Sequence, residues 1–205
     1  MATPGQLQTA LAASLGYASG SVYQSATSLR EAGLLTTGGR GQAAAQMGDT
    51  DAANLLIAML AAETARSAAA VTKLTRETPL YERVGSIEAG PSARGRLAFP
   101  HAKSVGALIV ALLDDTRNRR LRDIVITLDV QVGGGRVDLS ARKASPDEGF
   151  DGEMDMLFIH TFESGRKVTR RRDSDERPVT AKRRTINRVG NGVFEDVVEI
   201  LDRKD

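Results

Sequence analysis

The chain has 205 residues, 41% of them hydrophobic, and a formal net charge of +2, which suits one large or two small folded domains. It contains no cysteine, which excludes disulfides and thiolate metal sites and fits a reducing compartment. The N-terminal residues lack a signal-peptide pattern and no apolar run reaches the roughly 18 residues of a membrane span, so we expect a cytoplasmic protein that does not enter a membrane.

Two helices are predicted at the start of the chain. Apolar residues recur at helical spacing over residues 7–15, and a glycine follows as a stop signal. The second helix is expected over residues 21–32, with Ser19 or Ser21 as its N-cap and Gly33 just past its end. A loop over residues 36–41 follows.

A third helix is predicted for the alanine-rich run DAANLLIAMLAAETARSAAAVTKLTRE, capped by Asp49 or Thr50. This run is apolar on nearly all sides, so we expect it to be buried against neighbouring elements or against another copy of itself. Prolines and glycines then gather over residues 78–100. We place the domain boundary there.

Strand patterns dominate the second part, after a predicted helix over residues 101–115. DIVITLDVQV alternates apolar and polar residues, and three glycines lead into RVDLSARKA, which predicts a hairpin. MDMLFIHTF is apolar in both registers and is interpreted as a central strand covered on both faces. PVTAKRRTIN is a weaker strand candidate, and a short helix over residues 193–201 closes the chain.

The predicted fold class is α+β. Residues 1–78 are assigned to a helical (winged) helix-turn-helix domain and residues 79–100 to a linker. Residues 101–205 are assigned to a small α+β domain with an antiparallel sheet.

The predicted second helix has two distinct faces. Val22, Ala26 and Leu29 share one face, spaced for burial. The opposite face carries Gly20, Tyr23, Gln24, Thr27 and Arg30. The stretch LAASLGYASGSVYQSATSLREAGLL resembles the winged helix-turn-helix of multiple-antibiotic-resistance-type transcriptional regulators, in which Leu-Ala, Leu-Gly, Ser-x-Val and Leu-x-x-x-Gly-Leu recur in that order. The succession of LREAGL, GGRG and DAANLLIA is also similar to uncharacterised phage and prophage proteins, without indicating a function.

The resemblance implies roles for individual residues. Residues that would face base edges, where glutamine pairs with adenine and a threonine methyl meets a thymine methyl, are Tyr23, Gln24 and Thr27. Residues that would contact the DNA backbone are Ser19, Ser21, Arg30 and Arg40, the last from a short wing over residues 38–41. Through residue 78 there are five basic and five acidic residues, so this part alone supplies few phosphate contacts.

A second candidate interface is the basic segment over residues 165–188. Its proposed patch consists of Arg166, Lys167, Arg170, Arg171, Arg172, Lys182, Arg183 and Arg184. If its flanks are strands, these side chains form a ribbon that binds phosphates regardless of sequence. The alternative is a solvated edge hairpin whose charges discourage association of sheets.

Residues typical of catalysis or metal binding are sparse. His101 and His160 lie in different predicted elements, and His160 is interpreted as a core histidine. The acidic cluster over residues 147–155 does not fit the EF-hand pattern, and GRGQAA is a weak dinucleotide-binding match. We therefore expect no enzymatic activity, no metal and no cofactor.

The leading hypothesis is a DNA-binding transcriptional regulator that reads double-stranded DNA through the helix at residues 21–32. Palindromic sites require a dimer or larger homo-oligomer, with the alanine-rich helix from Asp51 as the expected interface. One alternative is a phage DNA-packaging or assembly component, resembling a small-terminase ring. Another is a helical protein-interaction module that does not bind DNA.

Overall fold

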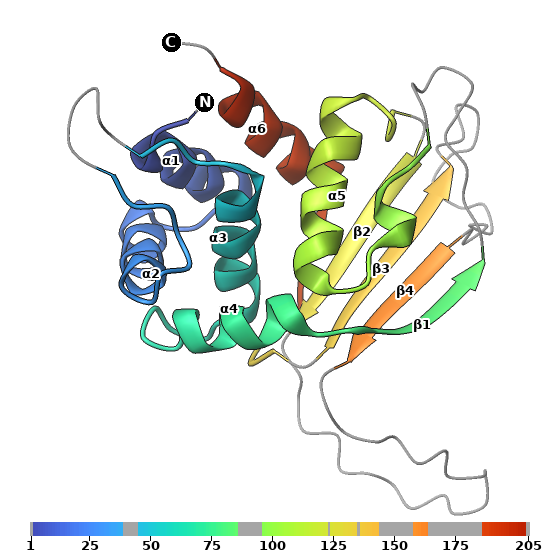
Figure 1. Ribbon diagram of the computed structural model, residues 1–205, viewed down its shortest axis with the longest axis horizontal. Coiled ribbons are helices and arrows are strands. Elements are labelled where there is room, and N and C mark those ends of the chain that lie inside the picture. The colour runs from blue at the N-terminus through green and yellow to red at the C-terminus, as the bar shows by residue number, and fades with distance from the viewer. Residues whose placement is uncertain are drawn as a thin grey trace, which may run out of the picture.

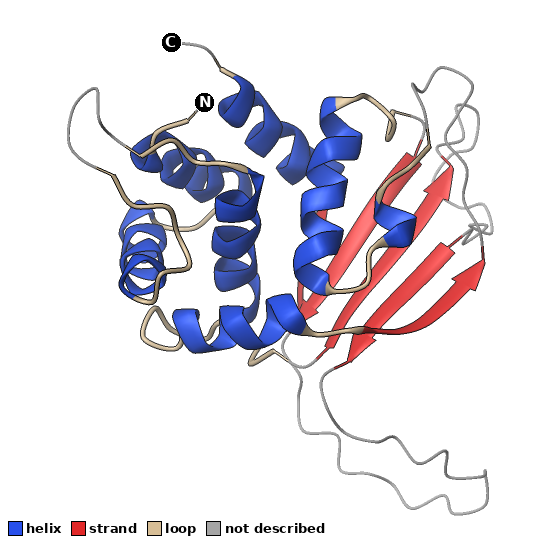
Figure 2. Ribbon diagram, in the orientation of Figure 1, coloured by secondary structure: helices blue, strands red, loops and turns tan. Residues whose placement is uncertain are grey.

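The computed structural model describes residues 2–38, 45–85, 96–122, 124–134, 136–143, 158–163 and 186–203. Within these ranges, six α-helices and a five-stranded antiparallel sheet are present, which confirms the predicted α+β class. The N-terminal helices form one side of the molecule, the sheet forms the other side, and later helices lie between them (Figures 1 and 2).

The first two helices are α1 (Pro4–Leu15) and α2 (Ser19–Glu31), joined by a short turn. Helix α1 ends at Gly16, whose φ of 67° is left-handed, and Gly33 after α2 has a φ of 70°. Both predicted stop signals are therefore confirmed. The predicted N-cap of α2 is wrong, because Ala18 occupies that position without a side-chain cap and Ser19 is already helical.

The alanine-rich run forms two helices rather than one, α3 (Asp49–Ala61) and α4 (Ala68–Glu77). The break is stabilised by reciprocal bonds, in which the backbone N–H of Thr64 donates to Ser67 Oγ and that of Ser67 donates to Thr64 Oγ1, both at 3.3 Å. Such side-chain bonds compete with helix continuation. Asp49 and Thr50 are not caps either; Asp51 accepts a bond from the N–H of the N-cap, Gly48.

Helix α3 is buried within the chain itself. Every residue from Asp51 to Ala61 is buried, and the helix packs against α2, α4, α5 and strand β2 (Ile124–Gln131). The predicted burial is confirmed for α3, whereas Leu74 of α4 is 50% exposed. Helix α3 itself offers no open face to a second copy, and an oligomer interface on the alanine-rich run stays a prediction.

The strands follow the order β1-β4-β3-β2-β5, with antiparallel neighbours. Their bounds are β1 (Leu80–Gly85), β2 as above, β3 (Arg136–Lys143), β4 (Phe158–Glu163) and β5 (Ile186–Gly190). The predicted hairpin is confirmed, with Val130 paired to Val137. The linker assigned to residues 79–100 is wrong over residues 80–85, which form edge strand β1.

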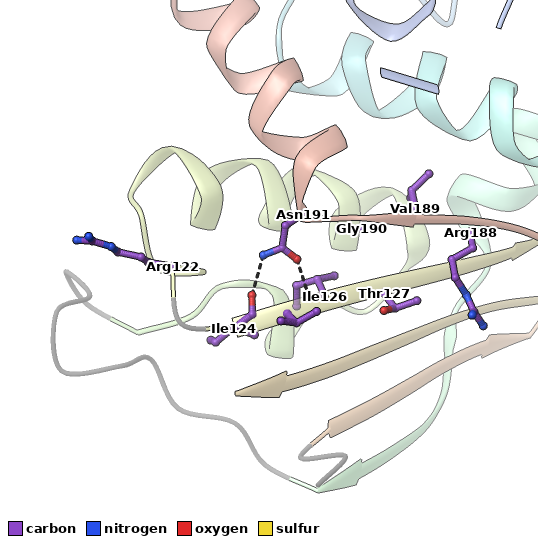
Figure 3. Close-up of a pocket in the computed structure, with 9 residues that line it drawn as sticks. Arg122, Ile124, Ile126, Thr127, Arg188, Val189, Gly190 and Asn191 are labelled. Atoms are coloured by element: carbon purple, nitrogen blue, oxygen red, sulfur yellow. Dashed lines mark hydrogen bonds between the residues drawn. The ribbon is translucent and has the colours of Figure 1, made fainter. Parts of the chain in front are cut away.

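Strand β4 lies inside the sheet between β1 and β3, as predicted. The described helices lie on one face of the sheet (Figures 1 and 3), and the predicted cover of the second face of β4 stays a prediction. On that face β2 and β3 bury alternate residues, including Leu128 and Leu139. The weaker strand predicted from residue 178 reaches β5 only at its end; residues 178–185 lie outside the described residues.

Helices α5 (Val105–Arg117) and α6 (Asn191–Asp202) confirm the two helices predicted in the second part. A short 3-10 turn, η2 (Phe99–His101), precedes α5. Helix α5 buries Leu108 and Leu112 over the sheet, and α6 packs on both α1 and α5. Buried residues of both halves of the chain belong to one hydrophobic cluster.

Two charged residues of α5 fix the helices in place. Asp115 has no exposed surface and accepts bonds from the backbone N–H groups of Ala98 and Phe99. Arg117 binds Asp49 of α3 at 2.7 Å and Asp202 of α6 at 2.8 Å. These hydrogen bonds raise the pKa of Arg117 above its usual value, so its charge persists across the accessible pH range.

Candidate nucleic-acid interface

The candidate site is built on α2, which packs through one face and leaves the other open. Val22, Ala26 and Leu29 have no exposed surface and pack against α1, α3 and α4. Figure 1 places α2 at the edge of the helical part, on the side away from the sheet. The burial predicted from the spacing of these three residues is confirmed.

The open face of α2 brings the predicted base-reading residues together. Tyr23 is 59% exposed and Gln24 is exposed beside it, one helical turn before Thr27, which is half-buried. Thr27 Oγ1 donates a hydrogen bond to the backbone carbonyl of Tyr23 at 3.0 Å. The face therefore carries hydrogen-bonding groups and one aromatic ring, and their role in reading bases stays a prediction.

The predicted backbone-contacting residues occupy the two ends of α2. Ser19 and Ser21 are exposed in the first turn, whereas Arg30 is half-buried in the last turn and has no ion-pair partner among the described residues. The rise of a helix places Ser19 and Arg30 about 16 Å apart along the axis. They cannot contact the same phosphate, so each would hold a different point of a DNA backbone.

Glu31 also lies on this open face, although the pattern of the sequence did not predict a role for it. Gly20, Gln24, Thr27 and Glu31 follow one another at spacings of four, three and four residues, the repeat of a single helix face. Glu31 is exposed. The same spacing could have identified it from the sequence. A carboxylate at this position repels the phosphates of a DNA backbone, although it can accept a hydrogen bond from cytosine N4.

The segment after α2 is anchored to α3 by two buried polar residues. Asp51 accepts bonds from the N–H of Thr36 at 2.7 Å, from Thr36 Oγ1 at 2.9 Å and from the N–H of Gly48 at 3.0 Å. Asn54 Nδ2 donates to the carbonyl of Leu34 at 2.7 Å. One carboxylate thus holds Thr36 and Gly48, which lie 12 residues apart in the chain, to the first turn of α3. The predicted wing residue Arg40 lies outside the described residues.

Sequence reasoning missed Asp51 and Asn54 as anchors. The available signal was a pair of polar residues three apart within an otherwise apolar helix. Their partners lie 15 and 20 residues away in the chain, so no local pattern identifies them.

The basic patch predicted from the sequence lies outside the described residues. These residues are Arg166, Lys167, Arg170, Arg171, Arg172, Lys182, Arg183 and Arg184. Arg188, at the end of that segment, lies on β5 and binds Asp129 of β2 at 2.7 Å. This hydrogen bond raises the pKa of Arg188, and the ion pair offsets its charge.

Candidate metal ligands do not gather in the described part of the chain. It contains no group of three or more histidine or acidic residues that could hold a metal ion. His101 is exposed in η2, whereas His160 lies on β4 opposite Leu139 of β3. The acidic cluster over residues 147–155 and the GRGQAA stretch lie outside the described residues.

A shallow surface hollow of about 400 Å³ lies at the junction between the end of β5 and the start of α6 (Figure 3). Its wall includes Asn191, whose Oδ1 accepts a bond from the N–H of Ile126 at 2.6 Å and whose Nδ2 donates to the carbonyl of Ile124 at 2.7 Å. This amide continues the ladder of β2 after β5 ends. The described residues that line the hollow include no carboxylate or imidazole, so none of them is suited to general-base catalysis.

The chain has no significant match to any known family model, curated protein or solved structure. Within the described ranges, no helix is both long enough and apolar enough to cross a membrane. The function is therefore inferred from the geometry of α2 and its surroundings.

Proposed function

We propose that this protein is a non-enzymatic transcriptional regulator that binds double-stranded DNA, with α2 as the recognition helix of a winged helix-turn-helix. The observation that carries the proposal is the division of α2 into a buried face and an open face. Val22, Ala26 and Leu29 hold the helix on its scaffold. Tyr23 and Gln24 point away from the described scaffold, where a major groove could receive them.

The connection between α1 and α2 supports this proposal. The turn is short, begins with left-handed Gly16 and leads directly into α2, as in helix-turn-helix motifs. Asp51 and Asn54 hold the segment after α2 against α3, which supports the proposal that a wing projects from a fixed base.

The charge of this surface limits how tightly α2 alone could bind. Arg30 is the only basic residue of α2, and Glu31 follows it directly. Affinity for duplex DNA depends strongly on neutralised phosphates. We therefore propose that the protein binds as a homo-oligomer, which repeats the contacts of α2 on successive half-sites. The interface between copies would lie outside the buried helix α3.

The proposal is tested with the full chain on a duplex enriched from a random pool, using fluorescence anisotropy. We expect Gln24→Ala to lose about 1–3 kcal/mol of binding free energy on the enriched duplex and much less on a random duplex. We expect Tyr23→Ala also to weaken binding. Tyr81→Ala is the matched control, since Tyr81 is 53% exposed and lies on edge strand β1.

The control variant should bind both duplexes as the unmodified chain does. The proposal fails if the chain binds no duplex at low salt, where phosphate contacts are strongest. It also fails if the variants at Tyr23 and Tyr81 lose affinity equally, because the loss at Tyr23 would then not indicate a DNA contact on α2.

A second candidate function is a helical module that binds another protein. It is favoured by Glu31 on the open face and by exposed Tyr23, a residue type enriched in protein interfaces. This function predicts no affinity for duplex DNA in the same anisotropy series, including at low salt.

A further inference from the structure

Thr27 lies on the open face of α2, and its hydroxyl hydrogen already bonds a backbone carbonyl of the same helix. We infer that Thr27 recognises thymine through its γ-methyl group, so that the protein prefers sites in which a thymine lies beside the base read by Gln24. The inference rests on the proposed function and identifies the class of DNA sequence that α2 reads.

The hydroxyl of Thr27 donates to the carbonyl of Tyr23, four residues earlier, at 3.0 Å. A threonine hydroxyl has a single O–H donor. While this bond persists, Thr27 cannot donate to the acceptors that guanine, adenine N7 or thymine O4 present in the major groove. The groups that remain for a base are the γ-methyl and the lone pairs of the oxygen.

The direction of the Thr27 hydroxyl favours the γ-methyl over the oxygen as the group that contacts a base. A helical threonine that bonds the carbonyl of residue i−4 turns its oxygen back along its own backbone. The oxygen is then held against the backbone near Tyr23, so the remaining substituent on Cβ is the methyl. The half-exposed state of Thr27 leaves part of the side chain accessible. Thymine is the base with a methyl group in the major groove.

The neighbouring glutamine places this contact within a short sequence element. Gln24 lies three residues before Thr27 on the same helix, which puts their Cβ atoms about 5–6 Å apart. That distance corresponds to one or two base-pair steps of about 3.4 Å. Because the amide of Gln24 suits adenine N6 and N7, we expect an element that combines adenine and thymine on one or both strands.

The test replaces single thymines by uracil, which removes only the C5-methyl group. The full chain is first used to enrich a site from random duplexes, and each thymine of that site is then replaced in turn. Burial of one methyl group predicts that one replacement weakens binding about fourfold. Thr27→Ser, which keeps the hydroxyl, should lose this sensitivity, and Thr27→Val, which keeps methyl groups, should retain it.

Thr116→Ser and Thr116→Val are the matched controls. Thr116 lies on α5 and makes the same type of bond, from its Oγ1 to the carbonyl of Leu112 at 2.7 Å. Both controls should show the fourfold sensitivity of the unmodified chain. They also report any general cost of removing a hydroxyl that bonds its own helix.

Other outcomes would overturn the inference in distinguishable ways. If Thr27→Ser stays sensitive to uracil while Thr27→Val does not, the oxygen makes the contact instead of the methyl. If a site is enriched but no thymine replacement matters, Thr27 does not read thymine although the proposed function stands. If no sequence is enriched, both the inference and the proposed sequence-specific function fail.

Discussion

Asp115 should be far more important for stability than its neighbour Asp114, although both carboxylates bind the guanidinium of Arg120. Asp115 has no exposed surface and accepts bonds from the N–H groups of Ala98 and Phe99 at 2.8 and 2.9 Å, as well as from Arg120 Nη1 at 2.9 Å. The side chain of Asp114 is 44% exposed and binds Arg120 at 2.7 Å. Comparing variants of Asp114 and Asp115 therefore distinguishes the effect of burial from the effect of the ion pair with Arg120.

The expected magnitude follows from the groups that each change leaves behind. Asp115→Ala removes the carboxylate acceptor of two N–H groups, at about 1–3 kcal/mol each. Removing one partner of a buried ion pair costs about 3–5 kcal/mol. These costs overlap, so we expect a loss of about 4 kcal/mol in the free energy of unfolding, against a typical total of about 5–15 kcal/mol. For Asp114→Ala we expect about 0.2–1 kcal/mol, because solvent screens the exposed pair.

Urea unfolding followed by far-ultraviolet circular dichroism measures both values, and it suits a chain without tryptophan. Comparable losses for Asp114→Ala and Asp115→Ala would refute the reasoning, since the ion pair alone would then account for the effect. A loss below about 1 kcal/mol for Asp115→Ala would also refute it, because the two N–H groups would have found other acceptors.

Asn191→Ala should lower the free energy of unfolding by about 1–3 kcal/mol, because two backbone groups of β2 lose their partner; unchanged urea unfolding would contradict this. Gly134→Ala should lower the melting temperature more than Gly133→Ala, since an added Cβ at Gly134 would lie 2.8 Å from Thr75 Oγ1 whereas none at Gly133 meets an atom within 4 Å. Equal shifts would argue against that close contact. Glu31→Gln should strengthen binding to duplex DNA at low salt, with the gain shrinking as salt is added. An unchanged salt series would mean that Glu31 does not face the backbone.

Several elements were predictable because their signals are local. The apolar spacing of α1 and α2 and the glycines at residues 16 and 33 indicate both helices and their ends. The alternation in β2 and β3, with glycines between them, indicates the hairpin. The same helix periodicity places Val22 inside and Gln24 outside, so the open face of the candidate site follows from sequence alone.

Other elements depend on contacts that no local pattern reveals. The alanines around residues 61–65 favour a continuous helix, yet Thr64 and Ser67 bond each other and end it. Strand β1 is flanked by proline and glycine, and it becomes a strand because β4 supplies its partner about 80 residues later in the chain. The anchoring role of Asp51 is hidden for the same reason, since its acceptor function depends on where the segment after α2 passes.

The contacts between the two halves determine what a ligand or mutation in the sheet can do to α2. Helix α3, on which α2 packs, is held at its C-terminal end by the sheet: the N–H of Gly133 donates to the carbonyl of Ala61, and Asn187 Nδ2 donates to the carbonyl of Leu60, both at 2.7 Å. Its N-terminal end is held through Arg117 to α6. Both β5 and the β2–β3 turn therefore contact the helix on which α2 packs. For this reason contacts from both halves of the chain determine the position of α2. Binding should therefore be measured on the full protein.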